Sequence, residues 1–181
     1  MAERERARRL SRRLELLITA IVVVILMVVG IGLAWALAQP DTAGSFAAQQ
    51  YGFPTPGQSS TIAAFLLVVV FLAQTAPMIA GLLSLRMAFR EIARHETIGA
   101  GAARWLRRSG IAFFVNALVM LLSLPLVSLI LSIDMPSGQR FLSIGFGTPE
   151  LLTLLVSGVL VMFGHLMTVA ARIEDENKRF I

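Results

Sequence analysis

An uncharged run from Leu16 to Ala38 constrains this chain more than any other feature. Its 23 residues include no Asp, Glu, Lys or Arg. A helix that rises ~1.5 Å per residue would make this run about 34 Å long, enough to cross a hydrocarbon core of ~30 Å. Six arginines stand among the 13 residues from Met1 to Arg13. A basic segment followed by an apolar run of this length predicts a membrane helix whose N-terminal end stays in the cytoplasm.

The composition agrees with a membrane protein. Hydrophobic residues make up 56% of the 181 residues and charged residues only 15%. The arginines flank apolar runs and form no continuous patch, so the net charge of +5 does not indicate direct nucleic-acid binding. The chain has no cysteine and only two histidines, His95 and His165. We therefore expect no disulfide, no metal site and no cofactor.

Three more uncharged or nearly uncharged runs follow. The sequence predicts an all-α integral membrane protein, a single domain over residues 1–181 with four membrane spans at about 16–38, 62–85, 109–133 and 150–171. The spans are joined by external loops at 39–61 and 134–149 and by a cytoplasmic loop at 86–108. Pro77, inside the second span, is expected to kink it and to free the carbonyl of Ala73.

The distribution of basic residues predicts the orientation. The N-terminal segment, the middle loop and the tail together hold 15 of the 16 Lys and Arg residues, and the remaining one is Arg140. Four spans with both termini in the cytoplasm satisfy this bias. A cleaved signal peptide ending at Ala36-Leu37-Ala38 is the alternative for the first span. That alternative is disfavoured, because signal peptides have apolar regions of only ~7–15 residues.

The connections carry their own patterns. Polar residues rich in Pro and Gly fill the first external loop, where Tyr51 and Phe53 are expected near the headgroups. The second span is expected to continue as an arginine-bearing helical arm that Gly99 and Gly101 break, before Trp105 returns the chain to the interface. In the second external loop, Phe141, Ser143 and Gly145 alternate with Leu142, Ile144 and Phe146, which predicts a short extended segment.

Few polar side chains lie within the spans. His165 precedes Arg172 by seven residues and Asn116 follows Arg108 by eight, which places them at similar depths, about 10–12 Å from the cytoplasmic boundary. We expect them to form a polar clamp between the third and fourth spans, and the alternative is a proton-linked or ligand-sensing role for His165. Gln74 is expected either to satisfy backbone groups freed by Pro77 or to line a cavity.

No arrangement of catalytic residues is recognisable. The spans contain serines, but no carboxylate lies at a helical spacing that would orient a histidine as a base within the membrane. There is no HExxH motif, and the glycines at 99 and 101 precede no GK[ST] sequence. We therefore do not expect an enzyme.

The C-terminal third is more distinctive. The run GQRFLSIGFGTPELL from Gly138 to Leu152, the ending RIEDENKRFI and the return RWLRRSGIAFF resemble the bacterial family catalogued as domain of unknown function 2975. The residues that match best are Gly138, Gln139, Arg140, Ser143, Glu176, Asn177 and Phe180. The resemblance implies a multi-pass protein of the bacterial cell (inner) membrane with no established enzymatic activity. It also implies a partnership with a small helix-turn-helix regulator, because such regulators are often encoded beside members of the family.

Two functions of different class follow. The first is a non-enzymatic regulatory or interaction protein that binds a cytoplasmic partner such as a small helix-turn-helix regulator, with the apolar tip Phe180-Ile181 of a helical tail as anchor. The second is a small transporter or channel that works as a homo-oligomer in the lipid bilayer. Coupled transport normally uses ionisable groups within the spans, and the absence of Asp, Glu, Lys and Arg from them favours the first function.

Overall fold

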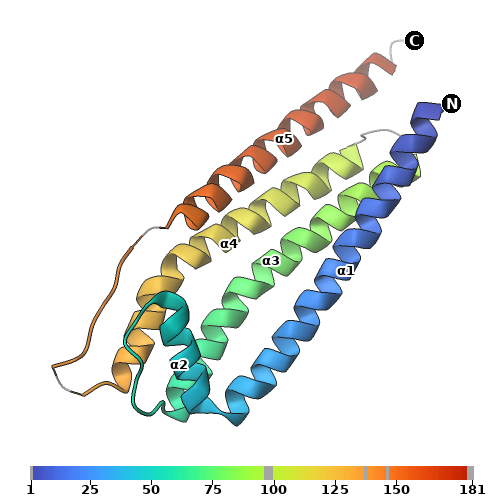
Figure 1. Cartoon of the computed structure of the whole chain (residues 1–181). Coiled ribbons are helices and arrows are strands. Elements are labelled where there is room, and N and C mark those ends of the chain that lie inside the picture. Colours follow the sequence, from blue (N-terminus) through green and yellow to red (C-terminus); the bar gives the residue numbers. More distant parts are fainter. Residues whose placement is uncertain (1, 96–99, 137, 146, 179–181) are drawn as a thin grey trace. The chain divides into compact units, whose positions relative to one another are not determined.

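The computed structural model describes residues 2–95, 100–136, 138–145 and 147–178. Over these residues the chain forms five helices, shown in Figure 1: α1 (Ala2–Ala38), α2 (Pro40–Tyr51), α3 (Thr61–His95), α4 (Ala100–Ile133) and α5 (Thr148–Lys178). Four of the helices are long and apolar enough to cross a membrane, over Arg13–Ala38, Thr61–Ile92, Gly101–Ile133 and Glu150–Ala170. The predicted all-α architecture with four membrane-length helices is confirmed.

The helices extend beyond the predicted spans. α3 runs to His95, so the arginine-bearing arm that follows Leu85 is a continuation of this helix, as expected. The arm ends at His95 and α4 begins at Ala100, so Gly101 lies in the first turn of α4 and does not break a helix. Gly99, the other predicted breaker, lies outside the described residues. A Cβ atom on Gly101 would stand 2.7 Å from Glu91 Oε1, and the carboxylate therefore lies beside the positive end of the α4 dipole. α5 continues to Lys178, and the charged tail prolongs it.

Helix α2 lies in what we predicted to be an irregular external loop. Pro40 occupies one of its first two positions, where the missing N–H costs no hydrogen bond, and Asp41 stands in the positively polarised first turn. The helix ends at Gly52, which adopts the left-handed conformation with φ of 69°. The N–H of Phe53 then donates to the carbonyl of Ala48 at 2.7 Å, which closes the last turn.

The helices contribute to two compact units. Unit 1 comprises Met1–Val24, Pro77–Val115 and Leu152–Ile181. Unit 2 comprises Ile25–Ala76 and Asn116–Leu151. The four long helices each contribute residues to both units, whereas α2 belongs to unit 2 alone.

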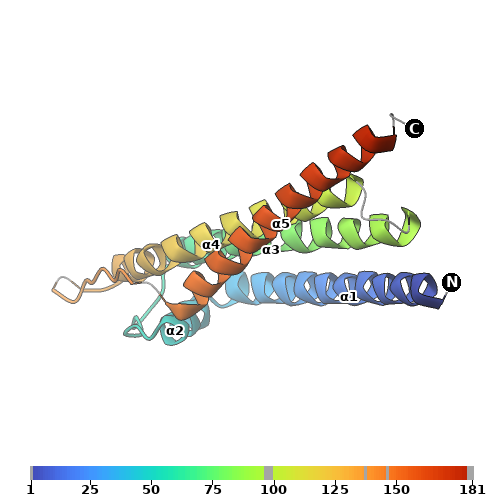
Figure 2. The same cartoon turned by 90° about the horizontal axis from the view of Figure 1, so that it is seen from above.

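In unit 1, α3 and α4 pack through small residues. The ring of Phe113 lies against Gly81, where an added Cβ atom would stand 2.9 Å from Phe113 Cε1. The buried hydroxyl of Ser109 donates to the carbonyl of Gly81 at 2.9 Å. Figure 2 gives a second view of α3 and α4. A residue without a side chain lets the second helix approach closely, which is how membrane helices commonly associate.

The contact between α4 and α5 in unit 1 is also made by glycines. A Cβ atom on Gly110 would stand 2.7 Å from the backbone nitrogen of Val161. A Cβ atom on Gly164 would stand 2.7 Å from the backbone nitrogen and Cα of Arg107. Each helix thus places a glycine against the backbone of the other, and the contacts run antiparallel.

Helix α1 contributes an ion pair to unit 1. Glu15 Oε1 lies 3.9 Å from Arg86 Nε of α3, and both side chains are partly exposed. Such a pair adds little to stability by itself, typically below ~1 kcal/mol.

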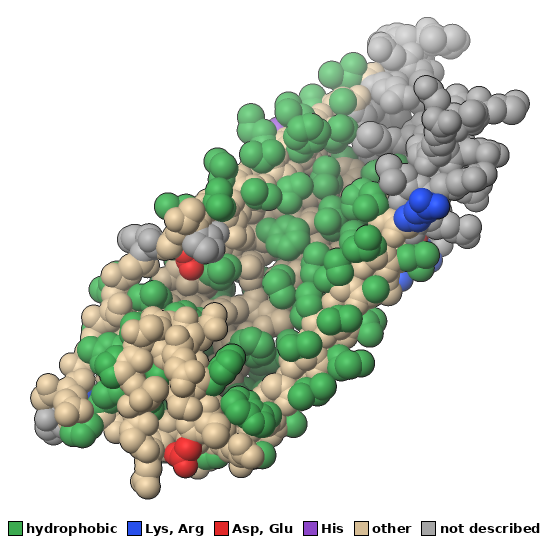
Figure 3. Space-filling model, viewed as in Figure 1, with side chains coloured by type: hydrophobic (Ala, Val, Ile, Leu, Met, Phe, Trp, Pro, Cys, Tyr) green, Lys and Arg blue, Asp and Glu red, His purple; other side chains and the backbone are tan. Residues whose placement is uncertain are grey.

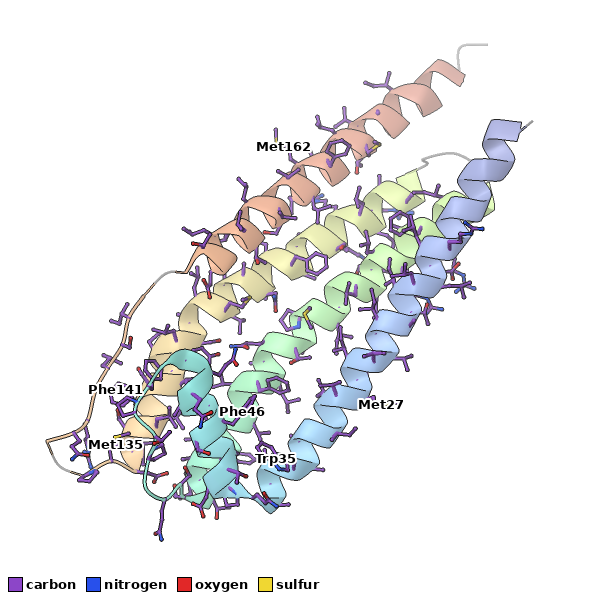
Figure 4. The ribbon with its side chains drawn as sticks, in the orientation of Figure 1. Met27, Trp35, Phe46, Met135, Phe141 and Met162 are labelled. Atoms are coloured by element: carbon purple, nitrogen blue, oxygen red, sulfur yellow. The ribbon has the colours of Figure 1, made fainter. Side chains whose placement is uncertain are left out.

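Apolar side chains cover much of the described surface of the long helices (Figure 3). Only 11% of the most apolar window is buried in α1, and the same share in α5. Met27 and Met162, labelled in Figure 4, are 62% and 66% exposed on these two helices. An apolar surface of this extent is consistent with contact with a lipid bilayer.

Candidate functional site

The most elaborately built region of the described chain lies in unit 2, where two connections pack against α3 and α4. The first connection, residues 52–60, joins α2 to α3, and the second, the described residues of 134–147, joins α4 to α5. Its centre is a buried cluster of Ala48 from α2 with Val127 and Leu131 from α4. Around this cluster lie partly buried side chains from α2, α3 and both connections, namely Tyr51, Phe53, Leu67, Val70 and Phe141. We call this region the cap.

Aromatic side chains join the two connections within the cap. The rings of Phe53 and Phe141 lie 5.0 Å apart between centroids, and Phe53 stacks on Tyr51 at 6.1 Å. Phe141 is labelled in Figure 4, beside the last turns of α4. Aromatic pairs at such distances contribute about 0.5–1.5 kcal/mol beyond the apolar area that they bury.

Two serines of α4 bind the backbone of the second connection. Ser132 Oγ accepts from the N–H of Phe141 at 3.1 Å and donates to the carbonyl of the same residue at 2.6 Å. One turn earlier, Ser128 Oγ accepts from the N–H of Ser143 at 3.1 Å and donates to Pro125 O at 2.9 Å. Residues four apart on a helix are spaced by about 6 Å, close to the spacing of residues two apart on an extended chain.

The same segment shows the predicted alternation. Phe141 and Ser143 are partly buried against α4, whereas Leu142 and Ile144 are 62% and 72% exposed. The chain from Gln139 to Gly145 is neither helix nor turn. The predicted alternation therefore holds from Phe141 to Ile144 and ends at Gly145, which is exposed like Ile144 before it.

Two carboxylates fix the start of α3 in the cap. Asp134 Oδ2, just after α4, accepts from the N–H and the hydroxyl of Ser60 at 2.7 and 3.1 Å. Ser60 Oγ in turn accepts from the N–H of Ala63, which is a helix N-cap. Asp41 Oδ1 of α2 accepts from the N–H of Ser59 at 2.8 Å. The end of the first connection, just before α3, is thus attached both to α2 and to the residue that follows α4.

Gln74 finds its partner in α2. Its amide Nε2 donates to Tyr51 Oη at 3.2 Å. Gln74 stands 12 residues before Arg86, about 18 Å along α3, so it falls near the middle of a ~30 Å hydrocarbon core. The bond shows that the Tyr51 hydroxyl reaches α3 at Gln74, and the expectation that Tyr51 rests near the headgroups stays a prediction.

Asn116 and His165 do not belong to the same compact unit. The Asn116 side chain is buried, its Nδ2 lies 3.7 Å from Met120 Sδ, and its Oδ1 has no hydrogen-bond partner among the described residues. His165 is exposed on α5. It directly follows Gly164, which lies against Arg107, nine residues before Asn116 on α4. The clamp between Asn116 and His165 stays a prediction.

The family-motif positions are divided between the cap and the tail. Gly138 has a φ of 97°, which favours glycine, and the N–H of Gln139 closes a turn onto Pro136 O at 3.1 Å. Arg140 is exposed, and Ser143 is held by Ser128. Glu176 and Asn177 lie within α5, whereas Phe180 lies outside the described residues.

The cap is suited to holding the chain in place. Ser128 Oγ and Ser132 Oγ are engaged by backbone groups, and the carboxylates of Asp41 and Asp134 accept from backbone N–H groups. Polar side chains that satisfy backbone groups are what irregular chain requires near a hydrocarbon core. The sequence reasoning missed Ser132, Asp134 and the bond of Tyr51 to Gln74, although the spacing of Ser128 and Ser132 on the helix matches that of Phe141 and Ser143 on the connection.

No family model matches this chain, and it matches no curated protein and no solved structure.

Proposed function

We propose that this chain is a non-enzymatic protein of the bacterial cell membrane that binds a cytoplasmic protein, with a small helix-turn-helix regulator as the leading candidate. The proposal includes a relationship of this chain to the family catalogued as domain of unknown function 2975, which its sequence resembles. It also includes cytoplasmic termini, since the positive-inside bias assigns the basic side of the molecule to the cytoplasm.

The observation that carries the proposal is the separation of charge between the two compact units. The ranges of unit 1 contain 15 of the 16 Lys and Arg residues together with eight of the 11 Asp and Glu residues. Those of unit 2 contain only Arg140 and three acidic residues. Charges of both signs gathered in one unit of a membrane protein support recognition of a soluble partner, because complementary charges speed association and set orientation.

The tail helix offers the contact. α5 continues past its apolar span, which ends at Ala170, as far as Lys178. This extension adds about two helical turns of mixed charge, RIEDENK, before the apolar residues Phe180 and Ile181 of the sequence. A short charged helix that is followed in the sequence by two apolar residues is suited to a groove on a partner.

The alternative function, a small homo-oligomeric transporter or channel, is favoured by one observation. The membrane-length windows of α1 and α5 are each only 11% buried, so both helices have apolar faces available to other copies of the chain. Lipid can cover the same apolar faces equally well, so this observation does not by itself establish an oligomer.

Deletion of residues 177–181 tests the leading proposal. The neighbouring reading frames are first searched for a small helix-turn-helix protein, whose absence would count against the proposal. The chain is then co-expressed with that protein, and the amount of regulator in the membrane fraction is measured. We expect the full chain to retain the regulator and the shortened chain to lose most of it, with membrane insertion unchanged. Arg140→Gln serves as the control, because it changes an exposed charge in unit 2 and should leave retention unaltered. Undiminished co-purification with the shortened chain would show that the tail is only a helix end.

A further inference from the structure

The first turns of α4 in unit 1 present arginines on the same face as exposed apolar residues. Arg104 and Arg108 are exposed, and they are followed at helical spacing by Ile111 and Val115, which are 46% and 42% exposed. Steps of four, three and four residues keep these side chains on one face of a helix. Charged and apolar groups thus form one continuous stripe along α4.

Trp105 fixes the position of this stripe relative to a membrane. It is partly buried, and the guanidinium carbon of Arg108 lies 4.9 Å from the centroid of its ring. Trp is enriched where hydrocarbon meets the headgroups, and a cation over its face is held at a defined place. Arg108 is therefore preorganised at headgroup level and is less free to fold back into solvent.

We propose that Arg104, Trp105 and Arg108 bind the headgroup of an anionic phospholipid, whose acyl chain lies along Ile111 and Val115. The guanidinium group matches a phosphate with two parallel hydrogen bonds, and the apolar part of the stripe matches a hydrocarbon chain. A soluble protein partner would fit the arginines but would leave Ile111 and Val115 to lipid in any case. One lipid molecule accounts for both parts of the stripe.

The test compares binding of phosphatidylglycerol and phosphatidylcholine with the same acyl chains, measured by native mass spectrometry of the purified full chain. We expect the wild type to prefer phosphatidylglycerol and the double variant Arg104→Gln, Arg108→Gln to lose roughly 25-fold of that preference, from about fivefold per arginine. The matched control Arg13→Gln, Arg90→Gln removes the same charge from α1 and α3 but leaves the stripe and its bidentate pairing with phosphate intact, and should change the preference by less than about twofold.

A lysine pair at the same positions separates geometry from charge. Arg104→Lys with Arg108→Lys keeps both charges but loses the planar fork, so we expect an intermediate preference. This variant also keeps the test valid if the glutamine pair does not fold. Equal loss in the control variant, or no preference in the wild type, would overturn the proposal. So would displacement of the lipid by inorganic phosphate at equal concentration, or a dimer of the chain in place of bound lipid.

Discussion

Ser128 and Ser132 hold the backbone of residues 141–143 in the way that a neighbouring strand would. Ser132 makes two hydrogen bonds to Phe141. Ser132→Ala leaves a partly buried N–H and a carbonyl without this partner, and such groups cost ~1–3 kcal/mol each. We expect the free energy of unfolding to fall by about 2 kcal/mol or more, as measured by denaturation in mixed micelles.

The matched control for that change is Ser123→Ala. Ser123 is as buried as these serines, but its hydroxyl donates only to the carbonyl of Val119 in the same helix at 2.7 Å. Its removal leaves the helical hydrogen bonds intact, so its effect should be well below 1 kcal/mol. Equal losses from Ser123→Ala and Ser132→Ala would mean that the hydroxyl contacts to Phe141 add no stability.

Single residues also show what could be predicted from the sequence. The alternation of Phe141, Leu142, Ser143 and Ile144 is local, and it predicted that neighbouring side chains lie on opposite sides, although not which side faces inward. The partner of Gln74 was not predictable, because Tyr51 is 23 residues away and meets it only after the first connection folds back. Asn116 and His165 were paired by depth alone, and depth does not determine which face of a helix a side chain occupies.

Among the helices, the contact of α4 with α5 depends on the missing side chains of Gly110 and Gly164. Gly164→Ala would place a methyl group 2.7 Å from the backbone of Arg107, and backbone cannot give way as a side chain can. We expect this change to destabilise unit 1 by about 1–3 kcal/mol, the usual cost of overpacking. Thermal unfolding of the purified protein, followed by circular dichroism, measures the loss.

Gly158→Ala provides the comparison within the same helix. No atom lies within 4 Å of a Cβ atom placed on Gly158, so the methyl group enters open space. Alanine is also the better helix former, and the variant should be as stable as the wild type or slightly more stable. A loss of stability as large as that of Gly164→Ala would show that the destabilisation by Gly164→Ala does not arise from the close contact of α5 with α4.

Helix α2 illustrates where prediction from element patterns stops. Its start signals, Pro40 and Asp41, and its end signal, Gly52, were visible, but the polar composition from Gln39 to Ser60 favoured a loop. The helix is stabilised by tertiary contacts, since Ala48 is fully buried against α4. Short helices in isolation are marginal in water, so local sequence alone could not have decided the matter.

At the scale of the whole molecule, the orientation in the membrane is testable by chemical labelling. Cysteines introduced at Gln139 and at Gly99 are exposed to an impermeant thiol reagent, since the natural chain has no cysteine. From the positive-inside bias we expect Gln139→Cys to react in intact cells and Gly99→Cys to react only after the cells are opened. The reverse pattern would invert the orientation.

The glycine contacts of α4 also restrict how this helix can move. Ser109 meets α3 and the adjacent Gly110 meets α5, so α4 is held on two neighbouring faces at one level. Turning α4 by one residue, about 100°, would drive side chains into the backbone positions that the glycines now leave open. Within unit 1, the close contacts with α3 and α5 therefore oppose rotation of α4 about its own axis. Any motion of α4 within unit 1 is expected to be a tilt or a shift shared with α3 and α5, and not a rotation of α4 about its own axis.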